Sequence, residues 1–159
     1  MEENKKIKIT DPKQALAKAQ KYCDYQERNH QEVRDKLYEW GLHRKDVEET
    51  ISQLITDGYL NEERFAIAYA GGKFRIKKWG RIKIKIELRK KKVSDYCIRR
   101  ALEEIDDNDY MKTLEEVISK KSKEIKVQNS KVKNYKVARY AMSRGFEPEL
   151  VWDIIKEHF

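Results

Sequence analysis

The sequence predicts an all-α protein in which three tandem three-helix repeats form an elongated, curved array. Charged residues make up 40% of the 159 residues and hydrophobic residues 39%, with only six Gly and two Pro. This composition is typical of a heavily solvated helical protein with modest cores. Apolar residues recur at helical spacing, and the same apolar pattern returns twice along the chain, which indicates a stacked helical array.

The first predicted repeat spans residues 12–57 and follows a loose N-terminal segment, residues 1–11. Asp11 and Pro12 suit the N-cap and first position of a helix that runs to about residue 26. A mainly polar segment precedes this helix start, so we expect the first repeat to begin here.

Capping signals also delimit the second and third helices of this repeat. Asn29 is a good N-cap, and Glu32 stands where a capping box requires a carboxylate. Gly41 ends the second helix, and the third ends at the Asp57-Gly58 turn.

The pattern recurs after 51 residues and again after a further 53, which predicts repeats at 58–105 and 106–159. Gly145 repeats Gly41, whereas Lys92 takes that place in the middle repeat. Residues 120–134 are basic and poor in apolar residues, so we expect a looser linker there. The equivalent apolar positions include Val33, Ile84 and Val137; Leu37, Leu88 and Ala141; and Val47, Ile98 and Val151.

The segment 81–88 fits two secondary structures. Basic and apolar residues alternate along it, which by periodicity indicates a half-buried strand. The repeat register favours a helix, and a lone strand has no obvious partner. As a helix it is apolar on two sides, with Ile84 and Leu88 on one and Ile82 and Ile86 nearly opposite, so one side faces its own repeat and the other a neighbouring repeat or a partner.

Enzymatic motifs are absent from the sequence. It contains no phosphate-binding loop, no zinc-protease helix motif and no C-x-x-C pair, so we expect a protein that is not an enzyme and uses no cofactor or metal. Cys23 and Cys97 fall on apolar faces as small hydrophobes. The histidines sit at predicted helix edges as surface or capping groups: His30, His43 and His158.

Cysteine use and hydropathy indicate the compartment. Two cysteines do not make a disulfide framework, which favours a reduced, cytoplasmic environment. The chain shows no apolar run of about 20 residues and no signal-peptide core, so no membrane contact is expected.

Positive charge is concentrated in residues 73–92, the basic window. This window holds eleven Lys or Arg against one Glu, a net charge of +10, while the whole chain is only +8 and its remainder therefore −2. Such density has no structural benefit, because the charges repel one another, and it indicates a polyanionic partner. The candidate binding residues here are Lys73, Arg75, Lys77, Lys78, Arg81, Lys83, Lys85, Arg89, Lys90 and Lys91.

A second basic stretch lies in the third repeat, between residues 120 and 139. If the repeats curve, the two stretches line one groove, in which Tyr135 and Tyr140 either stack on bases or pack in the core. Its candidate binding residues are Lys131, Lys133, Lys136 and Arg139, beside the further cations Lys120, Lys121, Lys123 and Lys126.

Three groups of residues carry a resemblance to the RecX family, the small bacterial modulators of the RecA recombinase. Together they cover nearly the whole chain, and the middle group is the most specific. The first group comprises Asn29, Glu32, Val33, Lys36, Leu37 and Gly41. The middle group comprises Gly58, Tyr59, Leu60, Asn61, Arg64, Phe65, Ala66, Gly80, Lys83, Ile84, Glu87, Leu88 and Lys91. The third comprises Arg144, Gly145, Phe146, Glu149 and Val151.

The chain departs from the family pattern at three positions. Asn61 stands where the family usually has Asp, and Asn caps a helix equally well. Arg81 replaces a usual Pro in the first turn of a helix. Lys92 replaces the Gly that normally ends that helix, which loses an easy left-handed cap and adds charge.

The resemblance implies a protein without catalysis that binds the RecA–DNA filament along its helical groove. It implies inhibition of ATP turnover, strand exchange and filament growth, and hence a role in recombination, repair and the SOS response. We expect a monomer whose contacts with single-stranded or duplex DNA are weaker and salt-dependent. The alternatives are a general nucleic-acid-binding module or helix-turn-helix transcription regulator, and a scaffold whose basic face meets an acidic protein.

Overall fold

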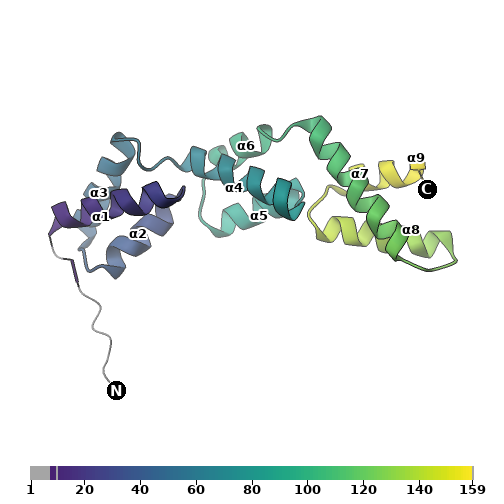
Figure 1. The fold of residues 1–159 in the computed structure, drawn as a ribbon, viewed down its shortest axis with the longest axis horizontal. Coiled ribbons are helices and arrows are strands. Elements are labelled where there is room, and N and C mark those ends of the chain that lie inside the picture. Colours follow the sequence, from purple (N-terminus) through teal and green to yellow (C-terminus); the bar gives the residue numbers. More distant parts are fainter. Residues whose placement is uncertain (1–7, 10, 159) are drawn as a thin grey trace, which may run out of the picture.

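The structure, a computed structural model, describes residues 8, 9 and 11–158. Within these residues the chain forms nine α-helices and no β-strand, in three consecutive three-helix units along an elongated molecule (Figure 1). Unit 1 comprises α1 (Pro12–Tyr25), α2 (His30–Glu39) and α3 (Arg44–Thr56); unit 2 comprises α4 (Glu62–Lys77), α5 (Arg81–Lys90) and α6 (Asp95–Glu103); unit 3 comprises α7 (Asp107–Glu124), α8 (Ser130–Ser143) and α9 (Pro148–His158).

The predicted all-α fold of tandem repeats is therefore confirmed. Most of the loose segment predicted at residues 1–11 lies outside the described residues. The repeat boundaries 12–57, 58–105 and 106–159 stay a proposed division, and Leu60 packs in the core of unit 1.

The second helix of every unit ends in the same left-handed turn. In this turn the backbone N–H groups of Leu42, Val93 and Phe146 donate hydrogen bonds to the carbonyl oxygens of Leu37, Leu88 and Ala141, at 3.2, 3.2 and 3.3 Å. Gly41 and Gly145 have φ of 105° and 98° in this turn, and Lys92 has φ of 61°. A side chain in the left-handed region costs roughly 1–2 kcal/mol, so the turn of unit 2 is the strained copy.

The segment that alternates between basic and apolar residues is a helix, α5, as the repeat register predicts. Ile84 and Leu88 are fully buried, whereas Ile82 and Ile86 are 40% and 47% exposed. The alternation therefore reflects a helix with two apolar sides, only one of which packs within its own unit.

The looser linker predicted at residues 120–134 is wrong over most of its length. Helix α7 continues to Glu124 and α8 begins at Ser130, which leaves only residues 125–129 between them. Low apolar content misleads here because α7 needs only one buried stripe along its 18 residues. That stripe comprises Tyr110, Leu114, Val117, Ile118 and Ser122.

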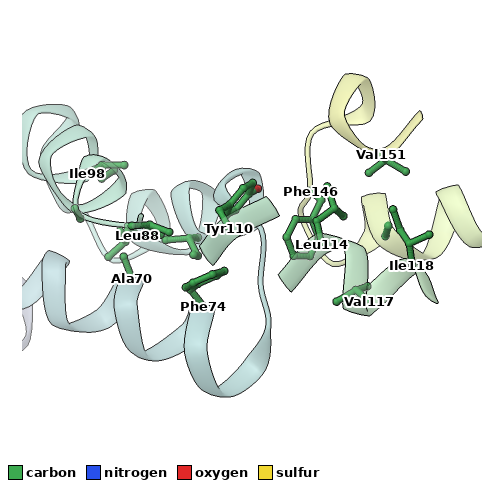
Figure 2. Close-up of a cluster of buried hydrophobic side chains, with 14 of the residues drawn as sticks. Ala70, Phe74, Leu88, Ile98, Tyr110, Leu114, Val117, Ile118, Phe146 and Val151 are labelled. Carbon is green, nitrogen blue, oxygen red and sulfur yellow. The ribbon is translucent and has the colours of Figure 1, made fainter. Parts of the chain in front are cut away.

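Two hydrophobic cores divide the chain unevenly. The first lies within unit 1 and includes Leu37 and Leu54. The second is continuous through units 2 and 3 and includes Leu88 and Phe146. Figure 2 shows the continuous core, with Phe74 and Tyr110 near the point where the two units meet. Units 2 and 3 therefore form one packed body.

The start of α5 is held by the end of α8. The N–H groups of Gly80 and Ile82 donate to the carbonyl oxygens of Arg144 and Gly145, at 2.9 and 3.0 Å. Gly80 caps α5 without a side-chain hydrogen bond, so unit 3 supplies acceptors for helix N–H groups that would otherwise lack partners. The two backbones approach so closely that a Cβ on Gly80 would lie 2.3 Å from the Gly145 carbonyl.

Unit 1 joins unit 2 through polar contacts. The Arg64 guanidinium pairs with Glu27, and the Glu62 carboxylate accepts the His30 backbone N–H at 3.4 Å. These side chains are partly exposed, and no apolar cluster of the described residues spans this joint. The joint is thus weaker than the one between units 2 and 3.

Gly145→Ala is expected to destabilise units 2 and 3 strongly. A Cβ there would lie 2.3 Å from the Lys83 Cβ and 2.6 Å from its backbone nitrogen, so α5 must move. We expect a loss of roughly 2–4 kcal/mol, measured by urea unfolding. The matched control is Gly58→Ala, where φ is also positive but no atom lies within 4 Å, and equal losses in the two variants would contradict the close packing of this junction.

Candidate functional site

The basic window folds into the last turn of α4, the connection 78–80 and α5. Lys78 ends α4 in the left-handed conformation, with φ of 55°, which turns the chain sharply into α5. Lys131, Lys133, Lys136 and Arg139 all lie on α8 of unit 3. The candidate residues thus occupy two surfaces, one on each side of the junction between units 2 and 3.

Four cations of the window have acidic partners. Lys78 lies 4.0 Å from Glu116, Arg89 3.4 Å from Asp95 and Lys90 3.2 Å from Glu87, while Arg81 makes two ion pairs. The other six candidate cations of the window have no carboxylate of the described residues within 4.0 Å. They are Lys73, Arg75, Lys77, Lys83, Lys85 and Lys91. These six carry the charge that is free to meet a partner.

Aromatic rings support three of these lysines. The ammonium groups of Lys73 and Lys83 lie 5.0 and 4.7 Å from the centre of the Trp79 ring. Tyr69 lies similarly close to Lys73 and to Lys91, at 5.5 and 5.6 Å. Attraction to the ring faces limits the motion of these cations without neutralising them.

Arg81 belongs to the junction between units 2 and 3 and not to the set of unpaired cations. Its guanidinium lies 2.9 Å from Glu147 and 2.8 Å from Asp107, and 3.7 Å from the centre of the Tyr110 ring. Its backbone N–H donates to the Tyr110 hydroxyl at 3.0 Å. A Pro at this position would lack that N–H, so Arg81 makes a hydrogen bond across the junction that Pro could not make.

Tyr110 is the centre of this junction. Its ring is 5.8 Å from that of Phe74 in unit 2 and 5.3 Å from that of Phe146 in unit 3, centre to centre. Its hydroxyl donates to the Glu147 carboxylate. Burial, with the hydrogen bond to Glu147, raises the pKa of the Tyr110 phenol far above its ordinary value, so the phenol stays protonated at neutral pH.

A groove of about 980 Å³ crosses the boundary between units 2 and 3. The residues that line it include seven cations and three carboxylates, Glu115, Glu116 and Glu124, so its walls carry an excess of positive charge. The cations are Lys77, Lys78, Lys112, Lys120, Lys121, Lys123 and Arg144. The groove therefore joins the first basic stretch to the beginning of the second.

The composition of this groove differs from the sequence prediction. Lys112 and Arg144 line it although neither belongs to a charge run, so nothing in the local sequence marks them as part of a basic surface. The four predicted α8 cations do not line it. Tyr140 does, and the Lys121 ammonium lies 4.4 Å from the centre of its ring, while Tyr135 is 58% exposed on α8.

The described residues provide little for other chemistry. No group of three or more His, Cys, Asp or Glu side chains among them is placed to hold a metal ion. Burial raises the pKa of the Cys23 thiol to about 11, so this thiol stays protonated at neutral pH. None of the described helices is long and apolar enough to cross a membrane.

Three family models match the chain, one for each unit. They are described as the first, second and third three-helix domains of RecX, and they match residues 15–54, 61–102 and 108–155. The three matches follow one another in the order of the units and together cover most of the chain.

Curated relatives with the name "Regulatory protein RecX" are similar in sequence. The relative from Bacillus cereus strain B4264 is 26% identical over 143 residues, which cover 90% of this chain and 53% of the relative. The relative from Prosthecochloris aestuarii strain DSM 271 / SK 413 is 33% identical over 97 residues, 61% of this chain and 64% of the relative. The chain thus matches only part of the length of each, about half in the first case.

Two solved structures are similar in fold. The crystal structure of RecX from Lactobacillus salivarius has a TM-score of 0.86 at 25% identity, covering 92% of this chain and 95% of that chain. Another crystal structure, of a regulatory protein RecX, has a TM-score of 0.82 at 20% identity, covering 92% and 72%. The arrangement of the three units is shared with both.

Tyr110→Phe is expected to cost about 1–3 kcal/mol of stability at pH 7, because it removes bonds to Glu147 and to the Arg81 N–H. The raised pKa means that the protonated phenol stabilises the fold below about pH 10, and that this stability is lost as the pH rises further. The difference between the wild-type chain and the variant should therefore shrink in urea unfolding at pH 10.5. Tyr135→Phe, at an exposed position, is the control, and a constant difference would contradict this role.

The triple variant Lys77→Gln, Lys78→Gln, Lys120→Gln is expected to weaken binding to single-stranded oligo-dT. Each lost phosphate contact should reduce the slope of log affinity against log salt by about 0.7, so the full loss is about 2. Fluorescence anisotropy over a NaCl series measures this slope. The control, Lys13→Gln, Lys21→Gln, Lys45→Gln, removes the same charge from exposed positions of unit 1, and equal slopes in both variants would show that the groove has no special role.

Proposed function

Because the chain belongs to the RecX family, we propose that it is a negative regulator of the RecA recombinase. In this proposal it binds the RecA–DNA filament and inhibits ATPase activity, strand exchange and filament growth. It acts by binding alone and catalyses no reaction itself. We propose that it works as a monomer in the cytoplasm, the compartment of its DNA and recombinase partners.

The basic surface across units 2 and 3 carries this proposal. Six cations of the basic window form no ion pair with a carboxylate of the described residues. The groove beside them continues the positive charge into unit 3. A nucleoprotein filament presents phosphates at regular intervals, so a rigid basic surface can contact several at once. Such contacts also attract the protein to the filament from a distance.

The elongated shape supports the same proposal. The three units follow one another along the long axis of the molecule (Figure 1). Unit 2, which carries the densest charge, lies in the middle. We infer that unit 2 anchors the chain on the filament, and that units 1 and 3 extend the contact on either side along the filament groove.

The test is inhibition of the recombinase in a purified system. We expect the chain, at well below one copy per recombinase subunit, to reduce DNA-dependent ATP hydrolysis and strand exchange. Reversing charge with Lys77→Glu, Lys78→Glu, Lys120→Glu should reduce the potency by about tenfold or more, because like charges then face the filament. The control is Lys13→Glu, Lys21→Glu, Lys45→Glu, with circular dichroism to verify helicity.

Two results would overturn the proposal. Unchanged ATPase and strand exchange at any ratio of the chain to the recombinase would exclude inhibition. A sequence-specific footprint on duplex DNA without recombinase would favour the transcription regulator instead.

A further inference from the structure

The outward side of α5 is apolar in the middle and basic around it. Ile82 and Ile86 are 40% and 47% exposed, and at a spacing of four residues they lie on one face of the helix. Lys85, Arg89 and Lys90 follow them at spacings of three or four residues, so they border the same face. We call these five residues the outer face of α5. Arg89 and Lys90 each pair with one exposed or partly exposed carboxylate, Asp95 and Glu87, whereas Lys85 has no such pair among the described residues.

The repeat fold does not require isoleucine on this face. The repeat register aligns Ile82 with Gln31 and Ile86 with Asp35 on α2 of unit 1. There the Gln31 side chain donates to Asp35 at 2.8 Å, on an exposed surface. The same position of the fold thus accepts a polar pair, so the fold does not require apolar side chains here, and the two isoleucines of unit 2 leave apolar surface exposed to water.

The chemistry of this face fits a protein more closely than a nucleic acid. Phosphates attract the lysines and the arginine but do not bury apolar surface. A protein interface commonly has an apolar centre within a polar rim, in which charge complementarity fixes partner and register. The matching surface is an apolar depression bordered by carboxylates.

The face is also held rigidly. The first N–H groups of α5 donate to unit 3, and Ile84 and Leu88 anchor its inner side in the continuous core. Lys85 and Arg89 also line a groove of about 660 Å³ between α5 and α6, whose lining further includes the carboxylates of Asp95, Glu103 and Asp107. A face that needs no ordering on binding loses less free energy when it docks.

We propose that the outer face of α5 docks onto an acidic protein surface with an apolar depression, and that the recombinase subunit presents this surface. The inference rests on the proposed function and divides the basic surface into two parts. The outer face of α5 contacts protein, and the groove between units 2 and 3 contacts phosphates.

The variant Ile82→Gln, Ile86→Gln tests this division. It removes the apolar centre while keeping every charge, and Gln has a good helix propensity. We expect affinity for recombinase assembled on a biotinylated oligo-dT, measured by biolayer interferometry, to fall by about tenfold or more. Affinity for bare oligo-dT should not change, and circular dichroism should show unchanged helicity.

A matched pair of single variants controls for the loss of any exposed isoleucine. Ile86→Gln and Ile55→Gln replace the same residue type at 47% and 44% exposure, on α5 and on α3. Only Ile86→Gln should weaken binding to the assembled recombinase. Equal effects of the two would overturn the inference.

The remaining outcomes separate this inference from the proposed function. A wild-type chain that neither binds nor inhibits the recombinase overturns both. A wild-type chain that inhibits, together with a double variant that inhibits equally well, overturns only the docking role of α5. A double variant that loses affinity for bare oligo-dT and for the filament in the same proportion assigns the face to DNA and likewise overturns it.

Discussion

The backbone bonds between the start of α5 and the end of α8 determine how units 2 and 3 are arranged. A helix begins with N–H groups that have no partner within the helix, and a helix ends with carbonyl groups in the same condition. Here each end satisfies the other, and the opposite partial charges of the two ends attract. These hydrogen bonds require close contact between the two backbones, so Gly80 and Gly145 have no space for a side chain. The hydrogen bond between the Arg81 N–H and the Tyr110 hydroxyl adds to the same contact.

This junction also holds the charged residues of the basic window in fixed positions. Ten excess positive charges in twenty residues repel one another, and an isolated helix with this sequence would be a poor one. The buried side of α5 and the acceptors from unit 3 hold the helix in place despite the repulsion. The charge is therefore presented on a fixed surface, with some cations neutralised by ion pairs and others supported by Trp79 and Tyr69.

The sequence predicted what depends on local pattern and repetition. The repeat register correctly favoured a helix at 81–88 over the strand that alternation suggested, and the capping box of Asn29 and Glu32 is present. Contacts between units could not be predicted from the sequence, because they join residues that are far apart along the chain. Arg81 lies in a charge run, and its role in binding stays a prediction, but the run could not reveal that Arg81 pairs with Asp107 and Glu147, which are 26 and 66 positions away. Lys112 and Arg144 lie outside any charge run, and only the arrangement of α7 and α8 in unit 3 brings them to the groove.

The polar joint between units 1 and 2 is expected to bend more easily than the junction between units 2 and 3. Exposed ion pairs such as Arg64 with Glu27 contribute only about 0–1 kcal/mol each and weaken with salt, whereas bending between units 2 and 3 would open a hydrophobic core. The junction between units 2 and 3 is therefore expected to resist bending more than the joint between units 1 and 2. A bend at the joint between units 1 and 2 would change the direction of unit 1 without opening either hydrophobic core.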